Sequence, residues 1–122
     1  HSFTANPLGC AAANASLDLL EKEPQKYLSF EEKHLSHLIK FKKLHYIKKI
    51  RVSGTIAAFD LEIGNKKGYF NNIGKEIKSL AMAQGLFIRP LGNVIYLLPP
   101  LCITDAQLEK SYWIIKRILD NL

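Results

Sequence analysis

One arginine inside a strongly apolar stretch has a position that suggests ligand binding. Arg89 follows the apolar residues 86–88 and precedes residues 90–93, whose sequence Pro-Leu-Gly-Asn is typical of a turn. A guanidinium keeps its proton in proteins, so an arginine among apolar neighbours must meet an anion or reach water. Its planar fork can hold a carboxylate through two parallel hydrogen bonds. Two interpretations stay open: a carboxylate-binding site, or a side chain that reaches solvent from the tip of a hairpin.

The residues around Arg89 predict a β-hairpin. Two apolar runs, residues 86–88 and 94–98, flank the turn. Proline presets φ for a turn, and glycine and asparagine tolerate a positive φ. Pro99 and Pro100 end the second run, because proline cannot donate a hydrogen bond to a sheet. The hairpin would place Arg89 at the end of its first strand.

Helical periodicity predicts four helices in the rest of the chain. Asn6 and Pro7 start an alanine-rich helix, whose small side chains should pack closely against a partner that need not belong to this chain. The other predicted helices cover residues 24–42, 70–84 and 104–119. Gly85 should stop the third helix, and Thr104 and Gln107 should form a capping box on the last.

The same periodicity predicts which helix faces are buried. In the second helix the apolar side comprises Leu28, Leu35, Leu38 and Ile39. In the last helix it comprises Leu108, Tyr112, Ile115 and Leu119, widened by Trp113 and Ile114.

Residues 47–63 predict two strands, or one bent strand, with Gly54 as a bulge or a point of close approach, and residues 64–68 predict a loop. The resulting order is helix, helix, strand, strand, helix, strand, strand, helix. It predicts an α+β fold: a small, mostly antiparallel sheet with helices on one face.

The composition limits the kinds of partner. The net charge is +6, and much of the excess lies in Lys40, Lys42, Lys43, Lys48, Lys49 and Arg51. No nucleic-acid-binding motif accompanies these residues, so a solvated rim is favoured over a nucleic-acid site. No apolar run could span a bilayer, and the start of the chain has no signal-peptide pattern. We therefore expect a cytoplasmic protein that binds neither nucleic acid nor membrane.

The cysteines and histidines predict no metal site. Cys10 and Cys102 stand in apolar surroundings and are expected to be small buried side chains, not a disulfide or metal ligands. His34 and His37 are three residues apart and could bridge a metal in principle. No further ligand completes the set, so surface histidines are expected.

No self-contained catalytic motif is present. The sequence has no H-E-x-x-H, C-x-x-C, G-x-S-x-G or G-x-G-x-x-G pattern, and no evident pair of carboxylates for acid–base chemistry. From its residues alone, the chain is a binding or accessory domain with one suggestive arginine.

Two segments resemble class III pyridoxal-phosphate aminotransferases. Residues 1–17, HSFTANPLGCAAANASL, are similar to a loop and alanine-rich helix of that class. Residues 87–100, FIRPLGNVIYLLPP, are most similar to those members of the class that act in biotin synthesis. The segments occur in the order and spacing of the family, so the resemblance extends over nearly the whole chain.

The resemblance implies a homodimeric fold-type I enzyme that uses pyridoxal 5′-phosphate, of which this chain is the C-terminal portion. Residues 1–23 would be a loop and interdomain helix at the boundary of the cofactor domain, and residues 24–122 the small domain. The chain begins with His rather than Met, which agrees with a piece of a longer protein. The lysine that binds the cofactor would lie upstream of His1, in a missing N-terminal cofactor domain, so the piece alone should be inactive.

The resemblance also implies site residues. Ser2 matches the hydroxyl residue that contacts the cofactor phosphate of the neighbouring subunit, and His1 precedes it; the family often has threonine in place of Ser2. Arg89 matches the arginine that pairs with the carboxylate of the substrate 8-amino-7-oxononanoate, which receives its amino group from S-adenosylmethionine. Tyr96 could line the same pocket or pack in the sheet. Leu101 stands where an aromatic residue is common.

Two alternatives stay open. The chain could come from another class III enzyme acting on ornithine, acetylornithine or a different ω-amine. It could also be a domain that binds a partner without catalysis.

Overall fold

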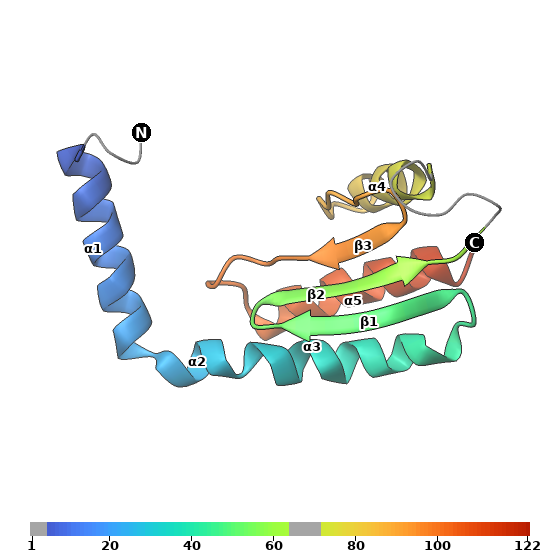
Figure 1. Cartoon of the computed structure of the whole chain (residues 1–122), viewed down its shortest axis with the longest axis horizontal. Coiled ribbons are helices and arrows are strands. Elements are labelled where there is room, and N and C mark those ends of the chain that lie inside the picture. The colour runs from blue at the N-terminus through green and yellow to red at the C-terminus, as the bar shows by residue number, and fades with distance from the viewer. Residues whose placement is uncertain (1–4, 64–71) are drawn as a thin grey trace.

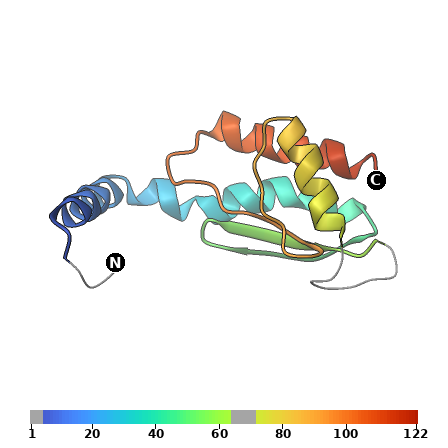
Figure 2. The same ribbon diagram turned by 90° about the horizontal axis from the view of Figure 1, so that it is seen from above.

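The computed structural model describes residues 5–63 and 72–122 and has the predicted α+β architecture. A three-stranded antiparallel sheet carries helices on one face, as the two views of the ribbon show (Figure 1 and Figure 2). The elements in chain order are α1 (Pro7–Lys22), α2 (Pro24–Leu28), α3 (Phe30–Leu38), the 3₁₀ helix η1 (Ile39–Lys43), β1 (Ile47–Ser53), β2 (Ile56–Leu61), α4 (Ile73–Ala83), β3 (Val94–Leu97) and α5 (Asp105–Leu119).

The sheet has the order β1-β2-β3, and the predicted pair of strands around Gly54 is confirmed. Ser53 pairs with Ile56, so Gly54 and the next residue form a two-residue hairpin loop, where a φ of +54° favours glycine. The bulge expected at Gly54 lies elsewhere. It falls between Lys48 and Arg51 of β1, where the intervening Lys49 has a φ of +49°.

The predicted hairpin of residues 86–98 is half right. Its turn is present: Leu91 and Val94 exchange two backbone hydrogen bonds of 2.9 Å. Its second run is β3, but the first run is not a strand, and β3 pairs with β2. Pro90 has no N–H to give to a ladder, and Ile88 turns into the core with 4% of its surface exposed. Residues 86–89 therefore cross the core side of the sheet as an irregular segment.

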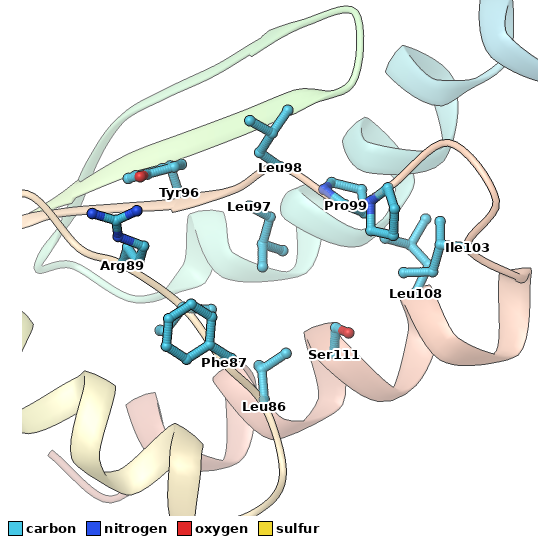
Figure 3. A pocket seen from close by; sticks show the side chains of 12 residues that line it. Leu86, Phe87, Arg89, Tyr96, Leu97, Leu98, Pro99, Ile103, Leu108 and Ser111 are labelled. Atoms are coloured by element: carbon cyan, nitrogen blue, oxygen red, sulfur yellow. The ribbon is translucent and has the colours of Figure 1, made fainter. Parts of the chain in front are cut away.

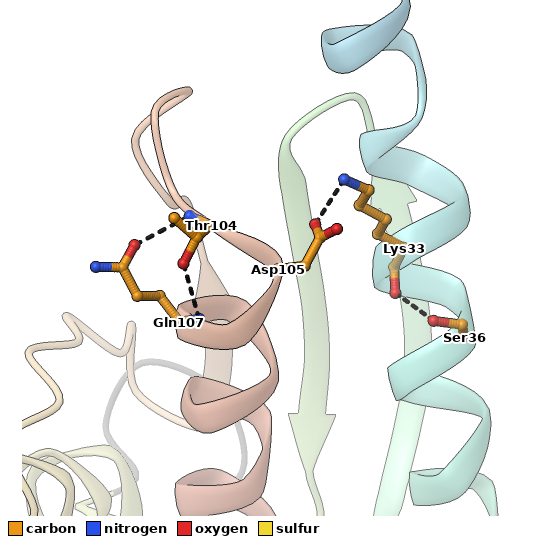
Figure 4. A network of polar contacts seen from close by, with 5 residues as sticks. All are labelled: Lys33, Ser36, Thr104, Asp105 and Gln107. Atoms are coloured by element: carbon orange, nitrogen blue, oxygen red, sulfur yellow. Dashed lines mark hydrogen bonds and ion pairs between the residues drawn. The ribbon is translucent and has the colours of Figure 1, made fainter.

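The stop predicted after α4 and the start predicted for α5 are confirmed, whereas the single helix predicted at residues 24–42 is divided into α2, α3 and η1. After α4, Gly85 has a φ of +79° and the Leu86 N–H donates to the carbonyl of Ala81 at 2.9 Å, the pattern of a Schellman cap. At α5, Thr104 and Gln107 form the capping box (Figure 4). In the same view Lys33 of α3 meets Asp105 at 2.6 Å, so an ion pair joins the starts of the two helices.

The buried face predicted for the second helix is right only at Leu38, which is 1% exposed. Leu28, Leu35 and Ile39 are 72%, 53% and 59% exposed. The face that packs on the sheet comprises Phe30, His34, Leu38 and Phe41. Because histidine interrupts this stripe, a count of apolar residues selects a neighbouring face that shares only Leu38 with the buried one.

The stripe predicted for α5 is confirmed with one exception. Leu108, Tyr112, Ile114, Ile115 and Leu119 are buried. Trp113 is 56% exposed and lies outside the core.

Helix α1 buries none of its residues against the described chain. It extends away from the sheet and is joined to it through α2 (Figure 1). Both cysteines are exposed, contrary to expectation, because Cys10 lies on this unpacked helix and Cys102 in the loop before α5.

The predicted loop at residues 64–68 and the first two residues of the helix predicted at 70–84 fall outside the described residues. Within the described ranges, no helix has the length and apolar character that crossing a membrane requires.

Candidate carboxylate-binding site

Arg89 lines a cavity of about 340 Å³ between the segment after α4, the end of β3 and the start of α5 (Figure 3). Tyr96, which precedes the last residue of β3, lines it as well. Most of the other walls are apolar, supplied by Leu86, Phe87, Ile88, Leu97, Leu98, Pro99, Pro100, Ile103 and Leu108, with Ser111 as the remaining polar residue.

Two local features set the position of Arg89. Burial alternates along its segment, because Ile88 is 4% exposed whereas Phe87 is 66% exposed and Arg89 is also exposed. The turn after Arg89 packs on α4 at Gly74, where a Cβ atom would lie 2.2 Å from the carbonyl oxygen of Gly92. The close contact needs a glycine, and it anchors the irregular segment that carries the guanidinium.

The guanidinium of Arg89 is available for a ligand. It makes no hydrogen bond or ion pair with any described residue, and none of the residues that line the cavity is acidic. Lys78 of α4 lies 5.8 Å from the ring centre of Phe87, which adds a second positive charge near the cavity. An unpaired cation beside apolar walls fits an organic acid, with its carboxylate on Arg89 and its hydrocarbon part along the walls.

The other arginine of the sheet region already binds a carboxylate of the chain. Arg51 donates to the carboxylate of Asp60 at 2.8 Å and to the backbone carbonyl of Lys49 at 2.7 Å. Lys49 lies 3.5 Å from the same carboxylate. These contacts neutralise Asp60, which is only 9% exposed, and hold the bulge of β1. Their role is structural, which leaves Arg89 as the better candidate for a ligand.

The two histidines are not the surface pair that the sequence predicts. His34 is buried and lies 3.0 Å from the carbonyl of Thr55 and 2.6 Å from the Tyr112 hydroxyl. A carbonyl only accepts, so Nε2 of His34 carries the hydrogen and Nδ1 accepts from the hydroxyl. Burial lowers the pKa of His34 and raises that of Tyr112, so both groups stay neutral. The described residues contain no cluster of three or more metal-ligating side chains.

The predicted site residues are only partly brought together. Arg89 and Tyr96 line one cavity, whereas Leu101 does not line it. His1 and Ser2 lie outside the described residues. Sequence reasoning missed Leu108 and Ser111, which α5 adds to the cavity wall. The helical pattern placed Leu108 in the core, but no sequence signal indicated that α5 lies next to Arg89.

The cavity by itself does not fit pyridoxal phosphate. None of its lining residues is a lysine that could bind the cofactor aldehyde, and its walls offer one cation and few other polar groups. Its chemistry fits the tail of an organic acid.

Comparison with known proteins places the chain in a family. The family model described as aminotransferase class-III matches residues 1–119. Adenosylmethionine-8-amino-7-oxononanoate aminotransferase of Synechococcus elongatus is 44% identical over 122 residues, which are all of this chain and 28% of that protein. The protein of the same name from Geobacter sulfurreducens is 40% identical over 89% of this chain and 25% of its own length. The chain thus spans about a quarter of the curated relatives that it matches.

Solved structures agree with the family match. The crystal structure of adenosylmethionine-8-amino-7-oxononanoate aminotransferase from Methanocaldococcus jannaschii superposes with a TM-score of 0.79 and 29% identity, over 96% of this chain and 29% of that one. A structure described as a cofactor-free transaminase gives a TM-score of 0.82 at 25% identity, over 99% of this chain and 30% of that one. This chain belongs to the class-III aminotransferase family.

Proposed function

We propose that the chain is the C-terminal part of an aminotransferase that transfers an amino group from S-adenosylmethionine to 8-amino-7-oxononanoate, giving 7,8-diaminononanoate for biotin synthesis. The observation that carries the proposal is the 44% identity, over the whole chain, with a relative named for these two compounds. Because the chain spans 28% of that relative, the activity belongs to a longer protein.

Arg89 would bind the carboxylate of the keto-amino acid. Two features support this role: the guanidinium has no partner among the described residues, and apolar side chains line the cavity beside it. The methylene chain of the substrate would pack against Leu86 and Ile103, with the charged end at Arg89. Tyr96 would form the wall on the sheet side of the same site.

The cofactor of the family, pyridoxal 5′-phosphate, supplies the carbanion chemistry when it is bound. In this proposal Ser2 donates a hydrogen bond to its phosphate across a dimer interface, next to His1. The lysine that binds the cofactor belongs to the part of the protein that precedes residue 1, and the piece alone is inactive. Residues 1–23 form the interdomain segment and residues 24–122 the small domain. A homodimer and a cytoplasmic location complete the proposal.

The test is the effect of Arg89→Ala on the two substrates of the full-length enzyme. We expect KM for 8-amino-7-oxononanoate to rise about 10- to 100-fold, which corresponds to losing a charged hydrogen-bonded contact of roughly 1.5 to 3 kcal/mol. KM for S-adenosylmethionine should change little. The conservative Arg89→Lys should restore part of the loss, because it keeps the charge but not the fork.

Equal effects on both substrates would contradict the role of Arg89. A substrate panel on the unmodified enzyme tests the reaction itself. Faster turnover of ornithine or acetylornithine would assign the chain to another member of the class.

A further inference from the structure

A second cavity, of about 400 Å³, lies between η1 and α5. It shares no lining residue with the cavity of Arg89. Its volume is within the usual range for sites that bind small molecules. Neither the sequence patterns nor the proposed reaction accounts for it.

The floor of this second cavity consists of buried aromatic side chains that pack on one another. Phe41 and Tyr112 line it, and they are 1% and 3% exposed. Their rings lie 6.0 Å apart, and the Tyr112 hydroxyl is held by His34. On its other side, Tyr112 stacks with His37 at 4.5 Å and an interplanar angle of 10°. Side chains fixed in this way make the cavity preformed, which lowers the entropy cost of binding.

An aromatic wall stands beside the floor. Trp113, the only tryptophan of the chain, lines the cavity and is 56% exposed. Arg117 lies 5.4 Å from its ring centre. An exposed indole next to a preformed cavity provides a surface on which a flat ring can stack.

The charge at the cavity is positive. Lys40 reaches it from η1 and Lys110 from α5, and neither forms an ion pair with any described residue. Lys116 also lines it but is paired with Asp120. Glu109 is the only carboxylate among the lining residues.

The pKa of His37, which also lines this cavity, is affected by the charges around it. Burial is the main cause that holds the pKa of His37 below its usual value, followed by the charge of Lys40. The opposing effect of Glu109 is smaller. At the imidazole of His37, the positive charge of Lys40 therefore outweighs the negative charge of Glu109.

We propose that this cavity binds an anion that carries a flat ring and has about the size of a nucleoside monophosphate. Its ring stacks on Trp113, and its anionic group lies between Lys40 and Lys110. The site is separate from the cavity of Arg89 and independent of the reaction proposed above.

Calorimetric titration of the full-length protein with uridine 5′-monophosphate tests the proposal. A pyrimidine is the better probe, because adenosine compounds could enter a site for S-adenosylmethionine. We expect saturable binding that weakens at least 10-fold in Lys40→Gln/Lys110→Gln. Trp113→Leu should reduce the affinity to that of inorganic phosphate, and Trp113→Phe should retain most of it. Glu109→Gln should tighten binding several-fold, because it removes a like charge.

Two controls make the outcome decisive. Lys42→Gln/Lys43→Gln removes two exposed lysines that do not line the cavity and should bind the probe as the unmodified protein does. Arg89→Ala should also leave this binding unchanged, which separates the site from the proposed reaction. Absence of saturable binding at millimolar probe, or equal affinity in the lysine double variant and its control, overturns the proposal. Far-ultraviolet circular dichroism of each variant excludes loss of fold as the cause.

Discussion

At the scale of single residues, the position of Arg89 depends on a contact between backbones. Gly74 lets α4 approach the turn that follows Arg89, and a methyl group there would meet the carbonyl oxygen of Gly92 at 2.2 Å and the Cβ atom of Pro90 at 2.9 Å. Neither contact can be relieved by rotating a flexible side chain. The residue that positions the candidate site is thus a glycine fifteen positions before the arginine.

We expect Gly74→Ala to lower the free energy of unfolding by about 1 to 3 kcal/mol through overpacking. If the proposed function holds, it should also raise KM for the keto-amino acid in the full-length enzyme, because the turn must move. Urea unfolding measures the first effect and steady-state kinetics the second. Gly9→Ala is the matched control: the added Cβ would have its nearest neighbour at 3.9 Å, so stability should stay equal or rise slightly. Equal stability of both variants would show that α4 and the turn are less tightly packed than described.

At the scale of elements, one imidazole joins three parts of the chain. His34 on α3 donates to Thr55 in the hairpin loop and accepts from Tyr112 on α5. The loop is held a second time, since the Gly54 N–H donates to the carboxylate of Glu31 at 2.6 Å. A charged His34 would donate from both ring nitrogens, so the Tyr112 oxygen would have to accept and the hydrogen of its hydroxyl would lose its acceptor.

The network predicts a loss of stability in mild acid. Burial lowers the pKa of His34 in the folded chain below the value of 6.5 that applies when it is unfolded. The unfolded chain therefore binds more protons in this range, and stability falls as the pH drops below about 6.5 towards the folded pKa. The slope should reach at most about 1.4 kcal/mol per pH unit for one histidine.

Urea unfolding between pH 8 and pH 5 measures this slope. His34→Gln should be less stable at pH 8 but have a flatter profile. His45→Gln, at an exposed position, should keep the slope of the unmodified chain. A profile that His34→Gln does not flatten would assign the acid sensitivity to another group.

Sequence patterns predicted the elements of the fold better than the faces that they bury. The strand pair, the stop at Gly85 and the capping box of Thr104 depend on local chemistry, so they can be predicted from a few neighbouring residues. The buried face of α3 depends on His34, whose partners Thr55 and Tyr112 are 21 and 78 positions away. A polar side chain that is satisfied over such a distance cannot be recognised as a core residue from local periodicity.

For the candidate site, too, local features could be predicted from the sequence and contacts between distant segments could not. Arg89 and the turn after it could be predicted, because charge and turn residues are evident in one short segment. The wall provided by Leu108 and Ser111 could not, because it results from the packing of α5 beside the segment after α4. The prediction of a strand before Arg89 failed although β3 is an outer strand of the sheet, because Ile88 turns into the core and Pro90 has no N–H to donate to a ladder.

At the scale of the whole molecule, α1 determines how the piece behaves alone. This helix of 16 residues buries no side chain, and Leu8, Leu17 and Leu19 are 80%, 56% and 62% exposed. A helix of this length is marginal in water without tertiary contacts. Its apolar side chains therefore need a covering surface.

We expect the isolated piece to self-associate through α1. Size-exclusion chromatography with light scattering should give a mass that rises with concentration. A version that begins at residue 24 should stay closer to a monomer, which provides the matched comparison. A monomer at all concentrations for the complete piece would contradict this expectation.

The edges of the sheet limit which kinds of assembly can form. The outer strand β1 carries Lys48, Lys49 and Arg51 and contains the bulge. The outer strand β3 has four residues and ends close to Pro99 and Pro100. Charge, irregular backbone and proline all oppose the addition of a further strand. Assemblies of this protein should therefore form through contacts between helices and should stay in solution when they are diluted. They should not seed fibrils of the cross-β type.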